Sequence, residues 1–292
     1  MTAELWLSGP GKSLALYGPM RLLTIVENRF GPDDELALDA GRYAFKLLDR
    51  LAPAPALLKR RPGASLEPNF AEPLFNAMIS AVKAVDQTDL WPLAAVAGTV
   101  AQAVAEYLEK AGAVKAIVDN GGDVAVFLAH GQTTEIGVRV SLKDPAPAYK
   151  VSLSGEVRPF WGLCSSGLGG RSLTQGIVDT AMCIGDSAAI ADAAATAVAN
   201  ASLMESNKIR RLPAERLRPE TDIPGLMVTS AVAPLTDEEV DRALEKAIIL
   251  AQSLVDRGVV FGALAALNGK LSITRDFNHS AAPLTSLPPT VG

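Results

Sequence analysis

The feature that most constrains the fold is a succession of elements that occurs twice along the chain. Residues 93–129 predict a helix, a glycine, an apolar strand, an Asn-Gly turn and a second strand, and residues 236–275 predict the same order. The Asn-Gly pairs, at Asn120 and Asn268, can supply the positive φ angles of a tight hairpin. This repetition predicts an α+β fold of two similar halves, with helices packed on antiparallel sheets. A ligand site is expected between the halves.

Length and composition indicate one globular unit. The chain has 292 residues, of which 49% are apolar, enough for a sizeable core. We expect a single domain over residues 1–292 with a flexible tail over 280–292. The formal charge of -5 leaves no basic stripe, so no nucleic acid partner is expected. The sequence shows neither a signal peptide nor an apolar run of about 18 residues, which predicts a cytoplasmic protein without a membrane partner; the oligomeric state stays unknown.

Two short patterns could suggest other chemistry. The string "GPGKS", Gly9–Ser13, resembles the end of a phosphate-binding loop, but Trp6 stands where that loop requires its first glycine. We therefore expect a turn between two N-terminal strands. Cys164 and Cys183 flank a loop in a chain without an export signal, which predicts free thiols.

The predicted helix from about Leu93 to Lys110 begins with small residues. They are Ala94, Ala95, Ala97 and Gly98. Small side chains let another group approach the helix N-terminus, where free N–H groups and the positive end of the helix dipole attract anions. Tight packing on a neighbouring helix or sheet is the alternative, and this segment taken alone favours it.

A segment rich in glycine and hydroxyl residues, Gly162–Gly176, is predicted to form a loop between two strands. Successive backbone N–H groups of such a loop can form a concave nest for an anion, with Ser165, Ser166 and Arg171 as further donors. A long flexible hairpin loop would need the same glycines.

The stretch "ADAAATAVAN", Ala191–Asn200, predicts a mostly buried helix that carries one carboxylate. Asp192 and Thr196 are four residues apart and lie on one face, behind a helix cap at Asp186 and Ser187. A buried carboxylate needs compensation, so Asp192 is exposed, hydrogen-bonded locally or bound to a cation. Mg²⁺ prefers oxygen ligands and would accept an Asp and a Thr at this spacing together with phosphate oxygens.

In their order along the chain, these motifs resemble those of the ApbE superfamily. The string "ADAAAT" has the form of the family's Asp-x-x-x-Thr helix, "LAAVAGTVAQAVAEYL" is similar to its Gly-Gly-Ile-Ala-Lys-Gly helix, and "AIVDNGGDVAVFL" is similar to its Gly-Gly-Asp turn. The shared strings, over residues 93–200, are most similar to an uncharacterised, signal-less cytoplasmic branch. The resemblance implies an ApbE-like fold related to the tunnelling fold. It also implies binding of FAD and Mg²⁺, with transfer of FMN to a protein threonine.

The same resemblance implies roles for individual residues. Asp192 and Thr196 match the metal-binding side chains, and Ala97 matches the alanine whose carbonyl completes the metal site. A second set corresponds to the turn that contacts the flavin nucleotide and to the region of the diphosphate: Gly121, Gly122, Asp123, Ser165, Ser166, Gly167 and Arg171.

The chain departs from the family at two points that concern catalysis. Gly98 replaces the lysine of the Ala-Lys-Gly element, and the His-x-x-Asp-Pro-x-Thr-Gly segment has no counterpart. His130 and His279 are expected at the surface, which leaves Asp179 as the candidate catalytic residue. The sequence thus predicts an FAD-like nucleotide-binding protein with a Mg-dependent site that acts on the diphosphate, by FMN transfer or by pyrophosphatase-like cleavage. The alternative is a non-catalytic binding module for a flavin or another small nucleotide-like ligand.

Overall fold

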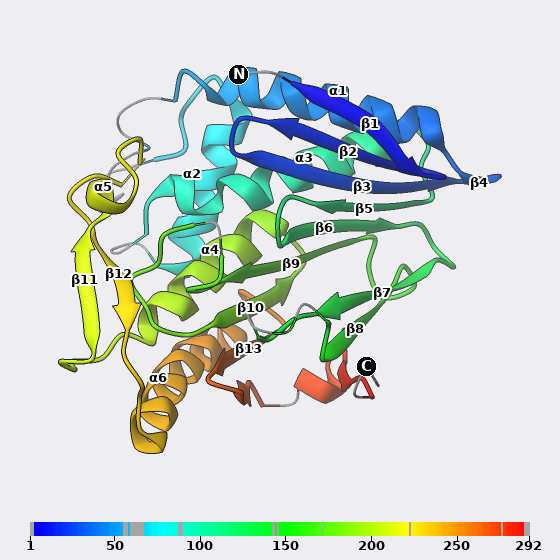
Figure 1. Cartoon of the computed structure of the whole chain (residues 1–292). Coiled ribbons are helices and arrows are strands. Elements are labelled where there is room, and N and C mark those ends of the chain that lie inside the picture. The colour runs from blue at the N-terminus through cyan, green and yellow to red at the C-terminus, as the bar shows by residue number, and fades with distance from the viewer. Residues whose placement is uncertain are drawn as a thin grey trace.

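A large antiparallel sheet forms the centre of the fold (Figure 1). The structure, a computed structural model, describes residues 3–54, 58, 67–86, 90–141, 144, 146–170, 172–221, 223–275 and 277–288. In the sheet the strands lie in the order β1-β2-β3-β5-β6-β9-β10-β13-β14, and the short β4 pairs with β3. These strands are β1 (Glu4–Gly9), β2 (Lys12–Tyr17), β3 (Met20–Asn28), β4 (Gly31–Pro32), β5 (Lys115–Asp119), β6 (Asp123–Leu128), β9 (Phe160–Ser166), β10 (Thr180–Gly185), β13 (Gly262–Leu267) and β14 (Lys270–Ile273).

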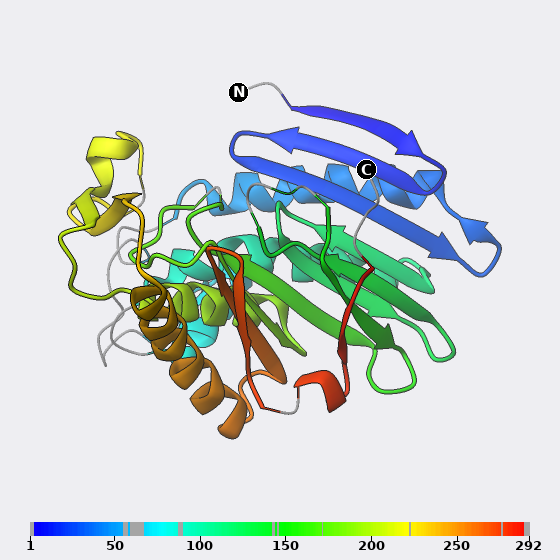
Figure 2. The ribbon, with the colours of Figure 1, turned by 60° about the horizontal axis from the view of Figure 1, so that its bottom comes forward.

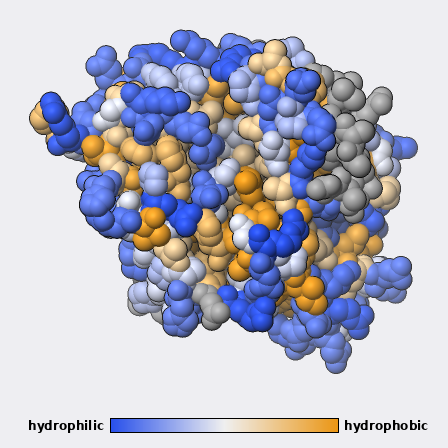
Figure 3. All heavy atoms as spheres, turned by 180° about the vertical axis from the view of Figure 1, so that it is seen from behind, coloured by the Kyte–Doolittle hydropathy of each residue, from blue (hydrophilic) through white to orange (hydrophobic). Residues whose placement is uncertain are grey.

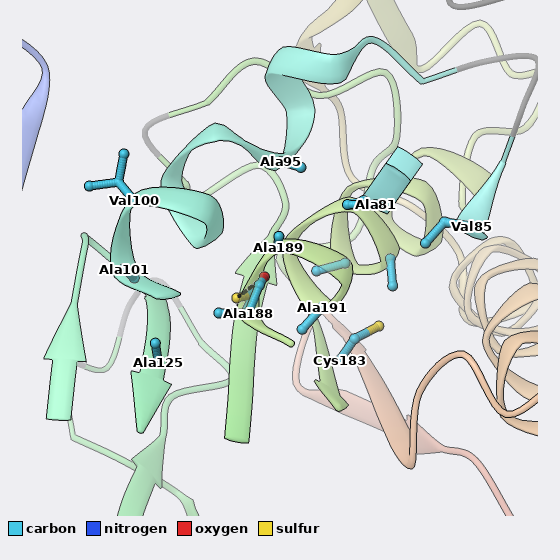
Figure 4. Close-up of a cluster of buried hydrophobic side chains, with 14 of the residues drawn as sticks. Ala81, Val85, Ala95, Val100, Ala101, Ala125, Cys183, Ala188, Ala189 and Ala191 are labelled. Atoms are coloured by element: carbon cyan, nitrogen blue, oxygen red, sulfur yellow. Dashed lines mark hydrogen bonds between the residues drawn. The ribbon is translucent and has the colours of Figure 1, made fainter. Parts of the chain in front are cut away.

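Helices cover one face of this sheet, and the alanine-rich helix α4 lies in the middle of them. α4 packs against β9 and β10 and against three neighbouring helices, α2, α3 and α6. Figure 4 shows Ala188, Ala189 and Ala191 of α4 in a cluster of buried side chains, most of them small, from the neighbouring elements. The helices on this face are α1 (Asp34–Leu51), α2 (Pro73–Val85), α3 (Val96–Lys110) with the preceding 3₁₀ turn η2 (Pro92–Ala95), α4 (Ala188–Ala201) and α6 (Asp237–Asp256). Small side chains thus let α4 serve as the packing centre of the helical layer.

A three-stranded sheet covers part of the opposite face (Figure 2). Its order is β15-β8-β7, and its inward side chains share a buried cluster with Trp161 and Leu163 of β9. The segment Leu284–Ser286 forms β15 and pairs with β8, although it falls inside the region expected to be a tail; residues 289–292 lie outside the described part. The elements here are β7 (Thr133–Val138), β8 (Tyr149–Ser154), η3 (Phe277–His279) and β15 (Leu284–Ser286).

A small two-stranded unit stands beside the main sheet, at the left of Figure 1. It consists of β11 (Ile209–Pro213), the four-residue α5 (Ala214–Leu217) and β12 (Met227–Val232). The side chain of Thr229 donates to the carbonyl of Gln175, and the N–H of Thr229 donates to the carbonyl of Thr174. These bonds fix β12 to the segment that precedes β10.

Both predicted helix–hairpin copies are present, and they belong to the same sheet. α3 is followed by the β5–β6 hairpin and α6 by the β13–β14 hairpin, which confirms the α+β class with helices on antiparallel strands. In the second copy, positive φ occurs at Asn268 and Gly269, as expected. In the first it falls on Gly121 and Gly122 rather than on Asn120, because this turn is one residue longer. A common origin of the two copies stays a prediction.

The segment Gly162–Gly176 differs from the expected loop. Its first part belongs to β9, a central strand between β6 and β10. A Cβ at Gly162 would lie 2.4 Å from the backbone nitrogen of Ala188, so the glycine there allows α4 to approach the sheet. Gly162 thus serves helix–strand packing within β9, and its prediction as a loop residue is wrong.

Two smaller expectations are confirmed. Residues Gly9–Ser13 hold the turn between β1 and β2. Cys164 and Cys183 are free, fully buried and directly opposite each other on β9 and β10. Burial raises the pKa of both thiols, because a buried thiolate would lose its hydration. Both cysteines therefore remain protonated and unreactive.

Within the described residues, the structure contains no helix with the length and apolar character that a transmembrane span requires. Seen from behind, most of the rim of the molecule is hydrophilic, and apolar side chains reach the surface nearer the middle (Figure 3).

Candidate functional site

A cavity of about 1290 Å³ collects most of the predicted site residues. It lies where the β5–β6 turn, the end of β9 and the start of β10 meet the N-terminus of α3 and one face of α4. The predicted residues among its lining are Ala97, Gly121, Gly122, Asp123, Ser165, Ser166, Asp179, Asp192 and Thr196. Gly167 is not part of the lining, and Arg171 lies outside the described residues.

Asp192 joins α4 to the first turn of α3. Its Oδ2 accepts a hydrogen bond of 2.8 Å from the N–H of Gly98, and only 7% of the residue is exposed. The residue that precedes α3, Ala95, offers no side-chain cap. A carboxylate from another helix therefore occupies the position in which an N-cap side chain would satisfy the free N–H groups.

The close approach of these two helices depends on Gly98. A Cβ at this position would lie 2.2 Å from the carbonyl oxygen of Ala188 and 2.8 Å from the Cβ of Asp192. A lysine, which the resemblance to the ApbE superfamily leads one to expect here, would collide with the backbone of α4. The replacement of that lysine is therefore built into the packing of α3 against α4.

The surroundings of Asp192 disfavour its charge. Burial and the like charge of Asp123 raise the pKa of Asp192 well above its ordinary value, and the N–H groups of Gly98 and Ala97 oppose this shift only in part. The sequence assigned Asp123 to the nucleotide turn, and the structure shows in addition that it is an electrostatic neighbour of Asp192. Two carboxylates near each other are stabilised when a proton or a cation lies between them.

The β5–β6 turn is held in place from both sides. The N–H of Gly122 donates to Oδ1 of Asp119 at 2.7 Å, and the side chain of Asn120 donates to the carbonyl of Ala97 at 3.3 Å. Ser165 donates from Oγ to the carbonyl of Gly122 at 3.1 Å. The predicted nucleotide turn, the predicted metal-ligand carbonyl and the end of β9 are thus tied together by hydrogen bonds.

The last turn of α4 contributes Asn200, a site residue that the sequence motifs did not indicate. Its Oδ1 accepts from the N–H of Gln175 at 3.0 Å and from the hydroxyl of Thr174 at 3.2 Å. Asn200 also lines the cavity. It fixes the segment after β9 to α4, and its position eight residues after Asp192 is the signal that could have shown this.

Asp179, the candidate catalytic residue, also has a structural contact. Its Oδ2 accepts from the N–H of Asn268 at 2.8 Å, so it stabilises the β13–β14 turn while lining the cavity. Neither histidine lines the cavity: His130 is exposed beside Glu156, and His279 belongs to η3. In the described residues, no group of three or more His, Cys, Asp or Glu side chains is arranged to hold a metal ion. A cation here would need hydroxyl and carbonyl oxygens as well.

Fold and site together define an α+β protein whose cavity holds a buried carboxylate at a helix N-terminus. A family model described as "AbpE bacteria" matches residues 17–273, and the chain belongs to this family. The ApbE-like resemblance of the sequence is thereby confirmed.

Curated relatives match a shorter region. A UPF0280 protein of Methanosarcina acetivorans is 39% identical over 121 residues, which cover 41% of this chain and 46% of the relative. A UPF0280 protein of Archaeoglobus fulgidus is 35% identical over 130 residues, or 44% of this chain and 49% of the relative. The matches thus span about half the length of these relatives.

Two solved structures are similar over nearly the whole chain. The flavinyl transferase ApbE of Pseudomonas stutzeri, in its apo form, has a TM-score of 0.49 and 13% identity, with 95% of this chain and 96% of the other covered. The flavin transferase ApbE of Vibrio cholerae has a TM-score of 0.39 and 10% identity, with 96% and 100% covered. Both scores are below 0.5 and do not by themselves establish a shared fold.

Proposed function

We propose that the protein binds a flavin nucleotide, FAD or a close relative, together with Mg²⁺, and acts on the diphosphate of that ligand. The observation that supports this most is the position of Asp192: a buried carboxylate beside Asp123, at a helix N-terminus and in the wall of a large cavity. Family membership supports the same proposal, since the sequence motifs that lie around the cavity are those shared with the family.

The donor atoms around Asp192 suit a hard cation. Carboxylate oxygens of Asp192 and Asp123, the hydroxyl of Thr196 and the carbonyl of Ala97 all belong to residues that line the cavity. Mg²⁺ prefers oxygen ligands and commonly uses one or two carboxylates together with substrate phosphates. A cation would also offset the two causes that raise the pKa of Asp192, its burial and the repulsion from Asp123. The residues therefore fit Mg²⁺.

Another part of the cavity suits a ring system. Apolar side chains there come from β2, β3, η2 and the segment before it: Leu14, Leu23, Leu90, Trp91 and Leu93. Binding sites for cofactors combine apolar walls with a few fixed polar groups. We assign this wall to the flavin ring and the β5–β6 turn to the phosphates.

In the proposed reaction the residues of the chain bind and orient the diphosphate. Bound Mg²⁺ would neutralise phosphate charge and make phosphorus easier to attack. Asp192 and Thr196 would hold the cation. Gly121 and Gly122 would leave room for phosphates beside the turn because neither has a side chain, although the N–H of Gly122 is already bonded to Asp119. Asp179 is the carboxylate that could take a proton from an acceptor. For this, the hydrogen bond from the N–H of Asn268 to the Asp179 carboxylate would have to break.

The test is to mix purified protein with FAD and Mg²⁺ and to follow FMN and AMP release and flavin attachment to protein. Asp192→Asn is the matched variant, because the amide oxygen can still accept from Gly98 while the charge is lost. We expect Mg-dependent FAD binding in the wild type and about a tenfold or greater loss in this variant. FAD binding that is equal with and without Mg²⁺ would contradict the metal assignment.

A second candidate, a binding module without catalysis, is favoured by one observation. Gly98 leaves no space for the lysine of the transferases, and neither histidine lines the cavity. Calorimetric titration with FAD and FMN, paired with the turnover assay, separates the candidates. Binding without any release of FMN or AMP across several acceptors supports the module, and turnover excludes it.

A further inference from the structure

Three arginines line the cavity in addition to the acidic residues near α4. Arg21 is the second residue of β3, Arg139 follows β7 and Arg218 follows α5, so three separate segments of the chain bring a guanidinium to one cavity. All three are exposed. Among the described lining residues, they are the basic ones, and no lysine accompanies them.

These arginines have no structural task in the described part of the chain. None of their side chains forms a hydrogen bond or ion pair with another described residue, whereas the side chains of Arg50 and Arg275 are paired with Glu72 and Asp256. A single exposed arginine without a partner is ordinary. Three that line one cavity, from three segments, add positive charge to its lining without being needed for the fold.

The cavity lining therefore carries charges of both signs. Acidic side chains come from the β5–β6 region, the start of β10, α4 and Glu220 beside Arg218, and the basic ones are the three arginines. Its volume of about 1290 Å³ also exceeds the roughly 300–1,000 Å³ of ordinary ligand pockets. An arginine guanidinium presents several N–H donors in a plane, which matches phosphate and carboxylate groups.

We propose that Arg21, Arg139 and Arg218 form an anion-binding subsite that takes a phosphate or carboxylate group other than the one held near Asp192. This subsite works without a metal ion, because its charge comes from the guanidinium groups. It rests on the lining of the cavity and does not require that the ligand be a flavin.

The experiment is calorimetric titration in Mg-free buffer of low ionic strength with four probes: riboflavin, FMN, inorganic pyrophosphate and citrate. The proteins are the wild type, a triple variant (Arg21→Gln, Arg139→Gln, Arg218→Gln), Asp192→Asn, and Arg242→Gln as a control. Arg242 lies exposed on α6, outside the cavity lining and without a described partner. Exposed, unpaired arginines can be replaced without loss of folding, which circular dichroism verifies.

We expect FMN to bind the wild type about tenfold or more tightly than riboflavin, since a charge-assisted hydrogen bond contributes about this much. The difference should persist in Asp192→Asn and Arg242→Gln, disappear in the triple variant, and shrink as salt is added. Pyrophosphate and citrate distinguish a phosphate subsite from a carboxylate subsite.

If neither flavin binds but pyrophosphate or citrate binds the wild type and not the triple variant, the subsite stands and the flavin proposal fails. The subsite proposal is overturned if no anionic probe binds, or if the triple variant binds the anions as tightly as the wild type does.

Discussion

The two helix–hairpin units differ most at the N-termini of their helices. α6 is capped by its own sequence: the N–H of Glu239 donates to the hydroxyl of Thr236, and the N–H of Thr236 donates to the carboxylate of Glu239. α3 has no such cap, and Asp192, 94 residues further along the chain, accepts from its third N–H instead.

This difference separates a self-sufficient helix start from one that depends on tertiary structure. The capping box of α6 lies within four neighbouring residues, Thr236–Glu239, and Lys208 adds a hydrogen bond to Glu239 from outside. The start of α3 is buried and exists in its present form only where α4 packs against Gly98. The same contact brings the carboxylate of Asp192 to the wall of the cavity. The unit without a local helix cap, α3 with the β5–β6 hairpin, is therefore the one that carries the candidate site.

The largest effect on stability is expected from Gly98→Ala, which disturbs the packing of the start of α3 against α4. An added Cβ would lie 2.2 Å from a backbone oxygen of α4, and backbone cannot yield cheaply. The gain of about 1 kcal/mol in helix propensity is smaller than the packing cost. We expect the free energy of unfolding to fall by about 2–3 kcal/mol in urea titrations.

Gly185→Ala is the matched control for Gly98→Ala, because the nearest atom to its added Cβ lies 3.7 Å away, an ordinary contact. Equal stability of the two variants would show that α4 can move away from α3 at little cost.

The next largest effect on stability is expected from replacing Asp192, the carboxylate of α4 that accepts a hydrogen bond from α3. Asp192→Ala leaves buried N–H groups at the start of α3 without their acceptor, which we expect to cost about 1–3 kcal/mol. Asp192→Asn keeps an oxygen acceptor and removes the repulsion with Asp123, so its stability without metal should stay within about 1 kcal/mol of the wild type. Urea unfolding of both variants is the measurement.

The pH dependence of these proteins provides a further check. The pKa of Asp192 is higher in the folded than in the unfolded state, so folding takes up a proton. Wild-type stability should therefore decline as pH rises from the unfolded value towards the folded one, relative to Asp192→Asn. An identical pH dependence of the two would contradict the buried, ionisable state of Asp192.

The sequence was sufficient for the elements but not for the contacts between them. The spacing of Asp192 and Thr196 placed both on one face of α4, and the Asn-Gly signals located two hairpins, because these patterns are local. The start of the Gly162–Gly176 segment does not look like part of β9, since Gly162 suggests a loop until α4 is known to lie on that strand. The pairing of Asp192 with Gly98 joins residues distant in the chain, and no local pattern contains it.

A smaller effect on stability is expected at the N-terminus of α6, which is capped by its own sequence. Thr236→Ala removes the hydroxyl that accepts from the N–H of Glu239, and the loss of such a cap costs about 1 kcal/mol. Because α6 lies outside the cavity lining, Mg²⁺ and nucleotide binding should not change. Urea unfolding and calorimetric titration test the two statements, and a loss of ligand binding would show that the two helix starts are coupled.

The smallest effect concerns the charge of Glu239. Hydrogen bonds from Lys208 and from the N–H of Thr236 lower the pKa of Glu239 from 4.5 to about 2. The carboxylate therefore contributes stability above pH 4.5, and this contribution is lost as pH falls towards 2. Solvent screens an exposed pair, so the shift in thermal midpoint should be small.

Glu239→Gln should show a shallower decline of the midpoint between pH 4.5 and pH 2 than either the wild type or Glu245→Gln, an exposed control on the same helix. Parallel declines in all three would mean that the charge of Glu239 adds nothing to the local cap, which then acts through its hydrogen bonds alone. The contrast with α3, whose start depends on the distant carboxyl group of Asp192, would become sharper.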